Sequence, residues 1–397
     1  MKYKLLSTIF YSNNKEYEDI YLKRLNCESA YRFTFNVKNS PAFLVITNEI
    51  LQKITEIYKK DKILFALSSN LPGIALTQYA TKCLIDEIKM TNEIEGVHST
   101  RKEINDILLG KTNSKKRLYG LVKKYQLFLE ESVSLETCED IRNIYDELVL
   151  KEVVQDDKDN APDGKFFRKD GVSVLSETGD IIHRGVYPEE DIIEMLSSGI
   201  SLLKDNNVNQ LISIAVFHYL CGYVHPFYDG NGRISRFISS YLLSEELEPL
   251  VSYRLAYTIK QNLKEYYKCF KISNDKKNKG DLTYFVFFFL DIISKSLDDL
   301  INSINERSER LDFYHEKVQS ICKSDEKKSS ILFILVQDAL FGESSLSIDE
   351  LKTITHIGTS TLRTSLNYFN EIGLLNINKS SKKHMYCINL DKLSEFN

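Results

Sequence analysis

Apolar residues recur every three or four positions along most of this chain, which predicts a mainly α-helical fold. Helices are expected at 49–58, 74–95, 118–131 and 134–150, and again from 189 to about 300 with breaks at 225–232 and 274–280. The stretch 211–224 is apolar on nearly all sides, which indicates a helix buried in the middle of a bundle.

Strand-like runs interrupt the helical pattern in two places. The runs 31–37 and 42–46 alternate between apolar and polar residues, and we interpret residues 1 to about 70 as an N-terminal elaboration. Further on, 172–174 and 181–183 flank the turn-rich stretch Ser-Glu-Thr-Gly-Asp. Two such runs around a short polar turn predict a β-hairpin.

The last 75 residues or so have a different pattern. Three helical segments, at 328–340, 348–355 and 359–372, are followed by strands at 374–378 and 385–390. Three helices and a β-hairpin in this order are typical of a winged helix, a variant of the helix-turn-helix.

Two groups of side chains in this part could bind DNA. One group on a helix would contact the major groove, and a basic group at the tip of the hairpin would contact phosphates. They are Thr359, Ser360, Arg363 and Thr364 on the helix, and Lys379, Lys382 and Lys383 at the tip. Three acidic residues nearby keep a protein-contact or oligomerisation module open as the alternative, so DNA binding and homo-oligomerisation both remain hypotheses.

Composition narrows the functional classes. The 397 residues suggest two or three domains, and 52 basic against 56 acidic side chains exclude a chain built as a polycation for nucleic acid. No apolar run approaches the roughly 20 residues of a membrane span, so no membrane association is expected. Seven cysteines without a Cys-x-x-Cys pair favour free thiols in a reducing, cytoplasmic environment.

The segment 225–236, His-Pro-Phe-Tyr-Asp-Gly-Asn-Gly-Arg-Ile-Ser-Arg, carries the candidate chemistry. Pro226 ends the preceding helix and holds His225 at its rigid C-terminal edge. In the turn 229–232 two glycines free the backbone, so that successive N–H groups can aim at one point. Such a nest at the start of a helix is an anion site.

Charged side chains around this turn support that interpretation. Arg233 and Arg236 are three residues apart, so both are expected to project toward the nest. A helix N-terminus is already positive, and two arginines there imply a multiply negative ligand. Asp229 would be an oxygen ligand for a Mg²⁺ ion shared with the phosphates, and His225 would be a titratable base.

The segment matches the signature of Fic-domain proteins, H-P-F-x-D-G-N-G-R-x-x-R, without a departure, and the chain resembles them over roughly residues 75–300. The resemblance implies a Fic helical core that transfers AMP from Mg-ATP to a Ser, Thr or Tyr hydroxyl of a target protein. It implies that His225 takes the hydroxyl proton, that Asp229 binds Mg²⁺ and that Phe227 fixes the loop. The phosphates would be held by Gly230, Asn231, Gly232, Arg233 and Arg236.

The same resemblance implies further binding residues. The predicted hairpin would be a flap that pairs with an extended segment of the target protein, although a purely structural hairpin remains the alternative. The flap residues are Val172, Ser173, Val174, Ile181, Ile182 and His183. Tyr266 and Tyr267 resemble the stretch that closes over adenine, and a position in the core is the alternative for them.

A second motif lies upstream. The apolar stripe of the helix 74–95 continues through Thr91 to Glu95, which places this carboxylate on the buried face in need of a cationic partner. Glu87, by comparison, is interpreted as an ordinary solvated position. The stretch 91–96 resembles the inhibitory motif [S/T]-x-x-x-E-[G/N] of Fic proteins, whose glutamate pairs with the second signature arginine, here Arg236.

These observations predict three domains: an N-terminal elaboration over 1–110 with the inhibitory helix at about 74–96, a Fic catalytic core over 111–305, and a winged-helix-like domain over 306–397. The predicted function is that of a self-inhibited protein adenylyltransferase that uses ATP and Mg²⁺ and also modifies itself. Three alternatives remain: removal of AMP, transfer of another nucleotide, and a DNA-binding regulator that senses nucleotide.

Overall fold

The computed structural model describes residues 3–112, 117–127, 132–175, 181–342, 345–378 and 384–396. Over these ranges the fold is mainly helical with small antiparallel sheets, which confirms the predicted fold class. The chain divides into two compact units, residues 1–62 with 84–298 and residues 63–83 with 299–397. The limits at 110/111 and 305/306 stay predictions about functional domains.

The first unit begins with two helices beside a β-hairpin. The helices α1 (Leu6–Ser12) and α2 (Asn14–Leu25) bury Tyr17 and Tyr21 together with Phe43 of the hairpin. The hairpin strands β1 (Ala30–Val37) and β2 (Ser40–Val45) pair antiparallel. The helix expected at 49–58 is the start of a much longer helix, α3 (Asn48–Asn70).

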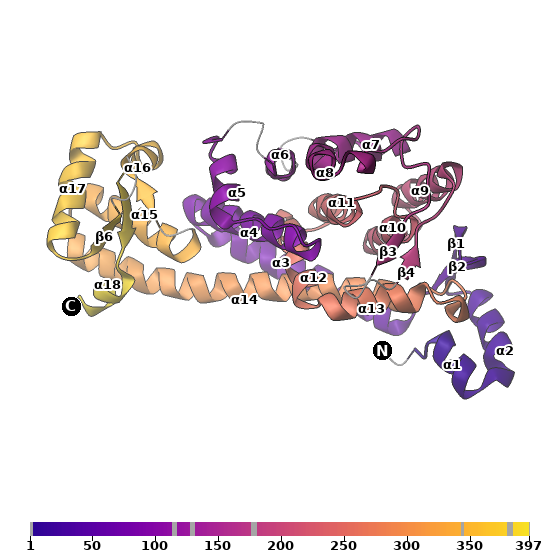
Figure 1. Ribbon diagram of the computed structural model, residues 1–397. Helices are drawn as coiled ribbons and strands as arrows, with labels where there is room; N and C mark the ends of the chain where they lie inside the picture. The colour runs from indigo at the N-terminus through magenta and orange to yellow at the C-terminus, as the bar shows by residue number, and fades with distance from the viewer. Residues whose placement is uncertain are drawn as a thin grey trace. The chain divides into compact units, whose positions relative to one another are not determined.

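The centre of this unit is α10 (Gln210–Val224), which is buried along almost its whole length, as its sequence predicts. It packs against α9 (Glu189–Leu203) and α11 (Asn231–Glu246), as can be followed in Figure 1. The other helices of the unit are α5 (Arg101–Leu108), α6 (Tyr119–Leu127), α7 (Cys138–Tyr145), α8 (Lys151–Asp156), α12 (Leu255–Gln261) and α13 (Leu263–Ser273). Short 3-10 turns are η2 (Lys158–Asn160), η3 (Pro249–Tyr253) and η4 (Lys276–Asn278).

Three predicted helical stretches differ from the structure. The stretch 189–300 has two further breaks, because α9 ends at Leu203 before α10 begins at Gln210 and because η3 separates α11 from α12. The helix expected at 134–150 begins only at Cys138, because Thr137 and Asp140 form a capping box there. It then widens into a π-helical turn, η1 (Asp146–Leu150), before α8. The helix expected at 118–131 ends in the structure at Leu127, and 128–131 lie outside the described residues.

Two long helices, α4 (Gly73–Ile94) and α14 (Thr283–Cys322), are continuous, although the division into compact units falls within each of them. The predicted limit at 305/306 therefore lies inside a helix. The predicted hairpin is present as β3 (Ser173–Leu175) and β4 (Ile181–Arg184). None of the helices in the described ranges combines the length and apolar content that a bilayer crossing needs.

In the second unit the predicted order of elements is present. It consists of α15 (Glu326–Phe341), α16 (Ile348–Thr355), α17 (Thr359–Glu371), β6 (Leu375–Asn378) and β7 (Met385–Ile388). The sequence missed β5 (Leu346–Ser347), which pairs with β7, and the short helix α18 (Leu390–Glu395).

On α17, Leu362, Leu366 and Phe369 are buried, while Ser360, Arg363 and Thr364 are exposed. The predicted basic tip, Lys379, Lys382 and Lys383, lies outside the described residues. Assignment of this unit to the winged-helix class, and its binding to DNA, stay predictions.

Candidate active site

The segment 225–236 turns sharply between two buried helices. Helix α10 ends at Val224, and His225 takes a left-handed conformation with φ 52° directly before Pro226. Gly230, with φ 80°, then caps the start of α11. A Cβ on Gly230 would lie 2.9 Å from Val149 of the π-helical turn, so the position requires glycine both for its backbone and for its packing.

The loop between the helices is held from inside. Asn231 accepts a hydrogen bond from the Phe227 N–H (2.9 Å) and donates one to the Phe227 carbonyl (2.8 Å). The Phe227 ring is fully buried and stacks on Tyr145 with ring centroids 3.7 Å apart. The side-chain amide of Asn231, which the resemblance assigned to phosphate, is therefore engaged in closing the loop, and only its backbone N–H remains available to a ligand.

The start of α11 has the features of an anion nest. Within the described part of the chain no hydrogen bond is recorded to the backbone N–H groups of Asn231, Gly232 or Arg233. The Gly230 N–H donates to the half-buried Asp229 carboxylate at 2.5 Å. Consecutive helix N-terminal donors without an acceptor are suited to a phosphate.

Arg236 contacts the end of α4. Its Nε donates to the Thr91 hydroxyl (2.8 Å), and its Nη2 donates to the Thr91 carbonyl (3.0 Å) and to Oε1 of Glu95 (2.8 Å). The Arg236 side chain is 1% exposed and that of Glu95 is 28% exposed. The predicted pairing is present, but Glu95 follows the last helical residue and is more exposed than a position on the buried face.

The carboxylate of Glu95 also lies over the nest. A Cβ placed on Gly232 would lie 2.1 Å from Glu95 Oε1 and 2.9 Å from Arg236 Nη1. The second glycine of the turn therefore leaves room for this carboxylate beside the helix N-terminus. A negative group held there occupies the place that an anionic ligand of the nest would take.

Arg233 has a different partner from the one expected. Its Nη1 lies 3.1 Å from Oε1 of Glu152 on α8, and the two side chains are 2% and 5% exposed. Burial raises the pKa of Glu152, and the Arg233 charge opposes that rise. The Nε and Nη1 groups of Arg233 make no hydrogen bond of good geometry among the described residues, so this buried cation retains donors for a further acceptor.

His225 is neutral at physiological pH. Burial lowers its pKa to about 4, the charge of Glu95 opposes that shift, and His183 and Arg168 add to it. A neutral imidazole can accept a proton, which a general base requires.

The hairpin is arranged only in part as predicted. Val174 pairs with His183, and Val172 precedes β3 and accepts from the Gly185 N–H. The His183 side chain is buried: its Nε2 lies 2.6 Å from the Tyr223 carbonyl, so it anchors the hairpin rather than facing a target. The turn 176–180 and the side chains of Ile181 and Ile182 lie outside the described residues.

Comparison with known proteins now identifies this arrangement. A family model described as "Fic/DOC family" matches residues 135–243, which include the whole loop and both arginines. The chain contains a Fic domain. The match lies wholly within the first unit and does not include Glu95.

Proteins named "Protein adenylyltransferase Fic" are similar to part of the chain. The one from Drosophila grimshawi is 35% identical over 95 residues, which are 24% of this chain and 18% of that protein. The one from Drosophila melanogaster is 38% identical over 84 residues, 21% of this chain and 15% of that protein. The chain thus matches less than a fifth of the length of these curated relatives.

A Fic family protein from Desulfovibrio desulfuricans G20 resembles the chain in fold. The TM-score is 0.52 at 19% identity, over 87% of this chain and 97% of that one. This likeness supports the helical fold around the Fic domain.

The aromatic pair expected to close over adenine is divided between core and surface. Tyr266 is buried, and its hydroxyl lies 2.8 Å from Nε2 of His218, which is fully buried itself. Tyr267 is 44% exposed. The alternative of a core position therefore describes Tyr266, and of the two rings only that of Tyr267 is exposed.

The interpretation of Glu87 as a solvated residue was wrong. It is fully buried and accepts hydrogen bonds from the N–H groups of Ala256 (2.8 Å) and Tyr257 (3.2 Å) at the start of α12. Burial raises its pKa to about 7 against these bonds. Sequence reasoning missed this residue, Glu152 and Arg168, because single charged residues in helices and loops have no local signal.

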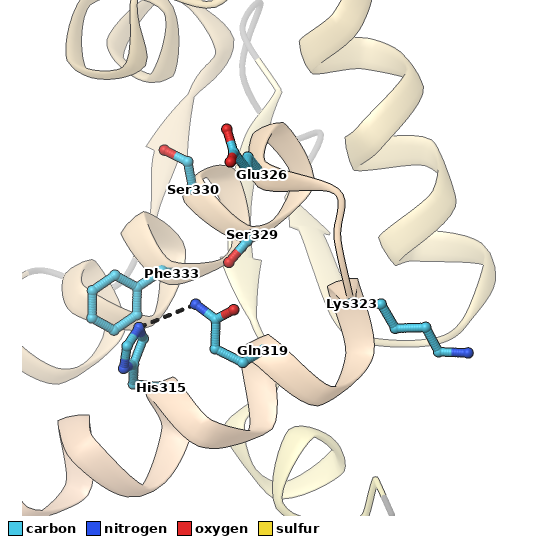
Figure 2. Close-up of a pocket in the computed structure, with 7 residues that line it drawn as sticks. All are labelled: His315, Gln319, Lys323, Glu326, Ser329, Ser330 and Phe333. Atoms are coloured by element: carbon cyan, nitrogen blue, oxygen red, sulfur yellow. Dashed lines mark hydrogen bonds between the residues drawn. The ribbon is translucent and has the colours of Figure 1, made fainter.

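A surface hollow of about 280 Å³ lies in the second unit, between the end of α14 and the start of α15. Figure 2 shows His315, Gln319 and Phe333 gathered on its wall, where Gln319 and His315 form a hydrogen bond. No residue of the Fic signature lines it, so it is no candidate for the anion site.

Proposed function

We propose that this chain is a self-inhibited protein adenylyltransferase that transfers AMP from Mg-ATP to a Ser, Thr or Tyr hydroxyl of a target protein and to itself. One observation carries the proposal: helix N-terminal N–H groups that have no acceptor among the described residues belong to the same loop and helix as two buried arginines and a neutral histidine. This combination suits a polyphosphate that is attacked by a hydroxyl group.

The phosphate chain would bind across the start of α11. The N–H groups of residues 231–233 would hold the α- and β-phosphates, Arg233 would contact the β-phosphate with its unused donors, and Arg236 would contact the γ-phosphate. Both guanidinium groups are buried, where their charge acts in a medium of low dielectric constant. Tyr267 would cover the adenine ring.

In the transfer step His225 would accept the proton of the attacking hydroxyl. The hydroxyl oxygen forms a bond to the α-phosphorus, the bond from that phosphorus to the oxygen bridging to the β-phosphate breaks, and pyrophosphate leaves. Because the histidine is neutral at pH 7, it is ready to accept this proton. The N–H groups of the nest and the two arginines stabilise the charge on the phosphates.

The residues present fit a magnesium ion. Magnesium is usually bound by one or two carboxylates together with substrate phosphates and water. Asp229 is half-buried beside the nest, and one of its oxygens is used by the Gly230 N–H. Asp229 would therefore hold the ion, which would neutralise charge on the phosphates when bound.

Self-inhibition would follow from Glu95. Its carboxylate is bound to Arg236 and lies against Gly232, so it occupies both the second arginine and the rim of the nest. ATP would have to displace it, or would bind with its α-phosphorus out of line. Thr91 also holds Arg236 in this position, through its hydroxyl and its carbonyl.

The decisive experiment is intact-mass analysis of Glu95→Gly protein after incubation with Mg-ATP, with Glu95→Gly/His225→Ala as the control. Addition of AMP to the single variant alone supports the proposal without a known target. A panel of labelled GTP, CTP and UTP decides whether another nucleotide is preferred. Absence of any nucleotide adduct on the Glu95→Gly protein would contradict the proposed self-modification.

A further inference from the structure

Arg168, in the loop before the flap, is a buried cation without an acidic partner. It is 0% exposed, and no ion pair to it is recorded among the described residues. Its guanidinium instead donates to backbone carbonyls at four places. These are His225 (2.9 Å from Nε), Asp170 (2.5 Å from Nη1), and Val186 and Val224 (2.7 and 3.2 Å from Nη2).

These bonds belong to a clamp around the end of α10. Four consecutive carbonyl groups there accept hydrogen bonds from the flap or from Arg168, and they belong to Tyr223, Val224, His225 and Pro226. The donors are His183 Nε2, the Val186 N–H, and the guanidinium and backbone N–H of Arg168. The C-terminal carbonyls of a helix normally lack partners within the helix, so this clamp replaces a cap.

The clamp surrounds the one strained residue of the loop. His225 has φ 52°, a left-handed conformation that residues other than glycine rarely adopt. Such a conformation persists only where the surroundings hold it in place. The carbonyl of His225 itself receives the Nε donor of Arg168, so the guanidinium acts directly on the strained residue.

We propose that Arg168 is a positioning residue for His225: its guanidinium holds the left-handed turn in the conformation that directs the imidazole to the site. The proposal rests on the proposed function, because it assigns His225 as the base. Arginine is required here because a planar group with five donors can reach four carbonyls in different directions. A lysine would keep the charge but could not reproduce this geometry.

Gly185, directly after β4, leaves the space that the Arg168 guanidinium fills. A Cβ on Gly185 would lie 2.4 Å from Nη2 of Arg168, so any other residue at this position would displace the group. The Gly185 N–H in turn bonds to the Val172 carbonyl at the base of the hairpin. Arg168 therefore connects the base of the flap to the turn that carries His225.

Charges around His225 are consistent with this role. Besides burial, Glu95 beyond the end of α4 and the Gly222 backbone raise the pKa of His225, and His183 from β4 and Arg168 lower it. An imidazole that leaves this buried position would titrate closer to the usual pKa of about 6.5. The titration of His225 thus reports on its position without requiring any activity.

The test uses the full chain with Glu95→Gly as the parent. In this parent, Arg168→Lys removes the planar guanidinium group, and Gly185→Ala displaces that group without removing it. The matched controls are Arg142→Lys, since Arg142 also donates to a backbone carbonyl (Phe166, 3.0 Å), and Gly171→Ala, since a Cβ there meets nothing within 4 Å. Because Gly185→Ala keeps Arg168, the proposal remains testable if Arg168→Lys fails to fold.

We expect Arg168→Lys and Gly185→Ala to lower the rate constant of self-modification at saturating ATP by about 30-fold or more, because misplaced catalytic groups cost that much. The dissociation constant of Mg-ATP should stay within about threefold of the parent, and both controls should behave as the parent does. Histidine NMR should show the pKa of His225 rising by about one unit or more in both test variants.

Two outcomes would overturn the proposal. One is a rate constant like the parent's in a folded Gly185→Ala protein with an unchanged His225 titration. The other is a loss of ATP affinity as large as the loss of rate, which would make Arg168 a purely structural residue. If the Glu95→Gly parent shows no transfer at all, the proposed function fails, whereas the His225 titration still decides whether the clamp positions the imidazole.

Discussion

Removal of the Glu95 carboxylate is the perturbation that tests self-inhibition most directly. The carboxylate makes one hydrogen-bonded ion pair with Arg236 and lies against Gly232 at the nest. Glu95→Gly removes both the charge and the atoms over the nest. Glu95→Gln removes only the charge, so the two variants separate electrostatic inhibition from steric inhibition.

The cost in stability can be estimated from the contacts. Breaking a fully buried ion pair costs about 3–5 kcal/mol. Glu95 is 28% exposed, and Arg236 keeps two hydrogen bonds to Thr91, so the cost here should be about 2 kcal/mol. A change of this size lowers the thermal midpoint of a domain of this size by about 4–8 °C.

With Mg-ATP bound, the Glu95→Gly protein should become more stable than the wild-type protein. At 100 times its dissociation constant, a ligand stabilises the folded protein by about 2.7 kcal/mol, which exceeds the cost of the substitution. The wild-type protein should gain less, because Glu95 still holds Arg236. Self-modification by AMP should rise at least about tenfold in Glu95→Gly, equivalent to roughly 1.4 kcal/mol of barrier.

The assay combines thermal shift, with and without Mg-ATP, and incorporation of labelled AMP. Glu93→Gln is the matched control for Glu95→Gln, because Glu93 lies in the last turn of the same helix and pairs with Lys89 instead. Arg236→Ala in the Glu95→Gly background should cancel much of the gain. Equal incorporation and equal ATP shifts in wild type and Glu95→Gly would refute the reasoning and leave Glu95 a helix-end residue.

Three further predictions concern His225, Glu152 and His218. His225→Ala in the Glu95→Gly background should abolish transfer while calorimetry shows ATP affinity near that of the parent, because the nest and both arginines remain; lost affinity would contradict its role as a base. Glu152→Gln should weaken ATP binding about fivefold or more by releasing Arg233, whereas the exposed Glu147→Gln should not, and equal affinities would show that the pair is unimportant. Burial lowers the pKa of His218 to about 3, so the stability linked to it is complete above about pH 6.5 and is lost as the pH falls toward 3. His218→Gln should therefore reduce by about one the number of protons taken up on acid unfolding, and an unchanged slope of stability against pH would show that His218 does not contribute.

The loop at residues 225–232 and the helices on either side of it could be predicted because they depend on local sequence patterns. The break of α10 at Pro226, the turn of residues 229–232 and the helix that follows depend on neighbours within a few positions. Proline and glycine act through their own backbone geometry, so their effect is visible without the fold. The pairing of Glu95 with Arg236 was predicted through the resemblance to a known motif, and the structure confirms the contact.

The same reasoning failed for Glu87 for a physical reason. Glu87, Thr91 and Glu95 follow one another at intervals of four residues, so helical periodicity predicts the same face for all three and cannot rank them by exposure. Only the packing of α12 decides that Glu87 is buried under two backbone N–H groups, while Glu95 extends beyond the helix end.

The sequence by itself determined the helical fold, the turn of residues 229–232 and the identity of the titratable groups beside it, because each depends on short-range periodicity or backbone geometry. The tertiary structure alone decided the partners of the buried charges. Glu152 reaches Arg233 across 81 positions and Arg168 reaches His225 across 57, and no local pattern encodes such distances. A buried charge is stable only with a partner, and the packing of the whole domain decides which group lies close enough to be that partner.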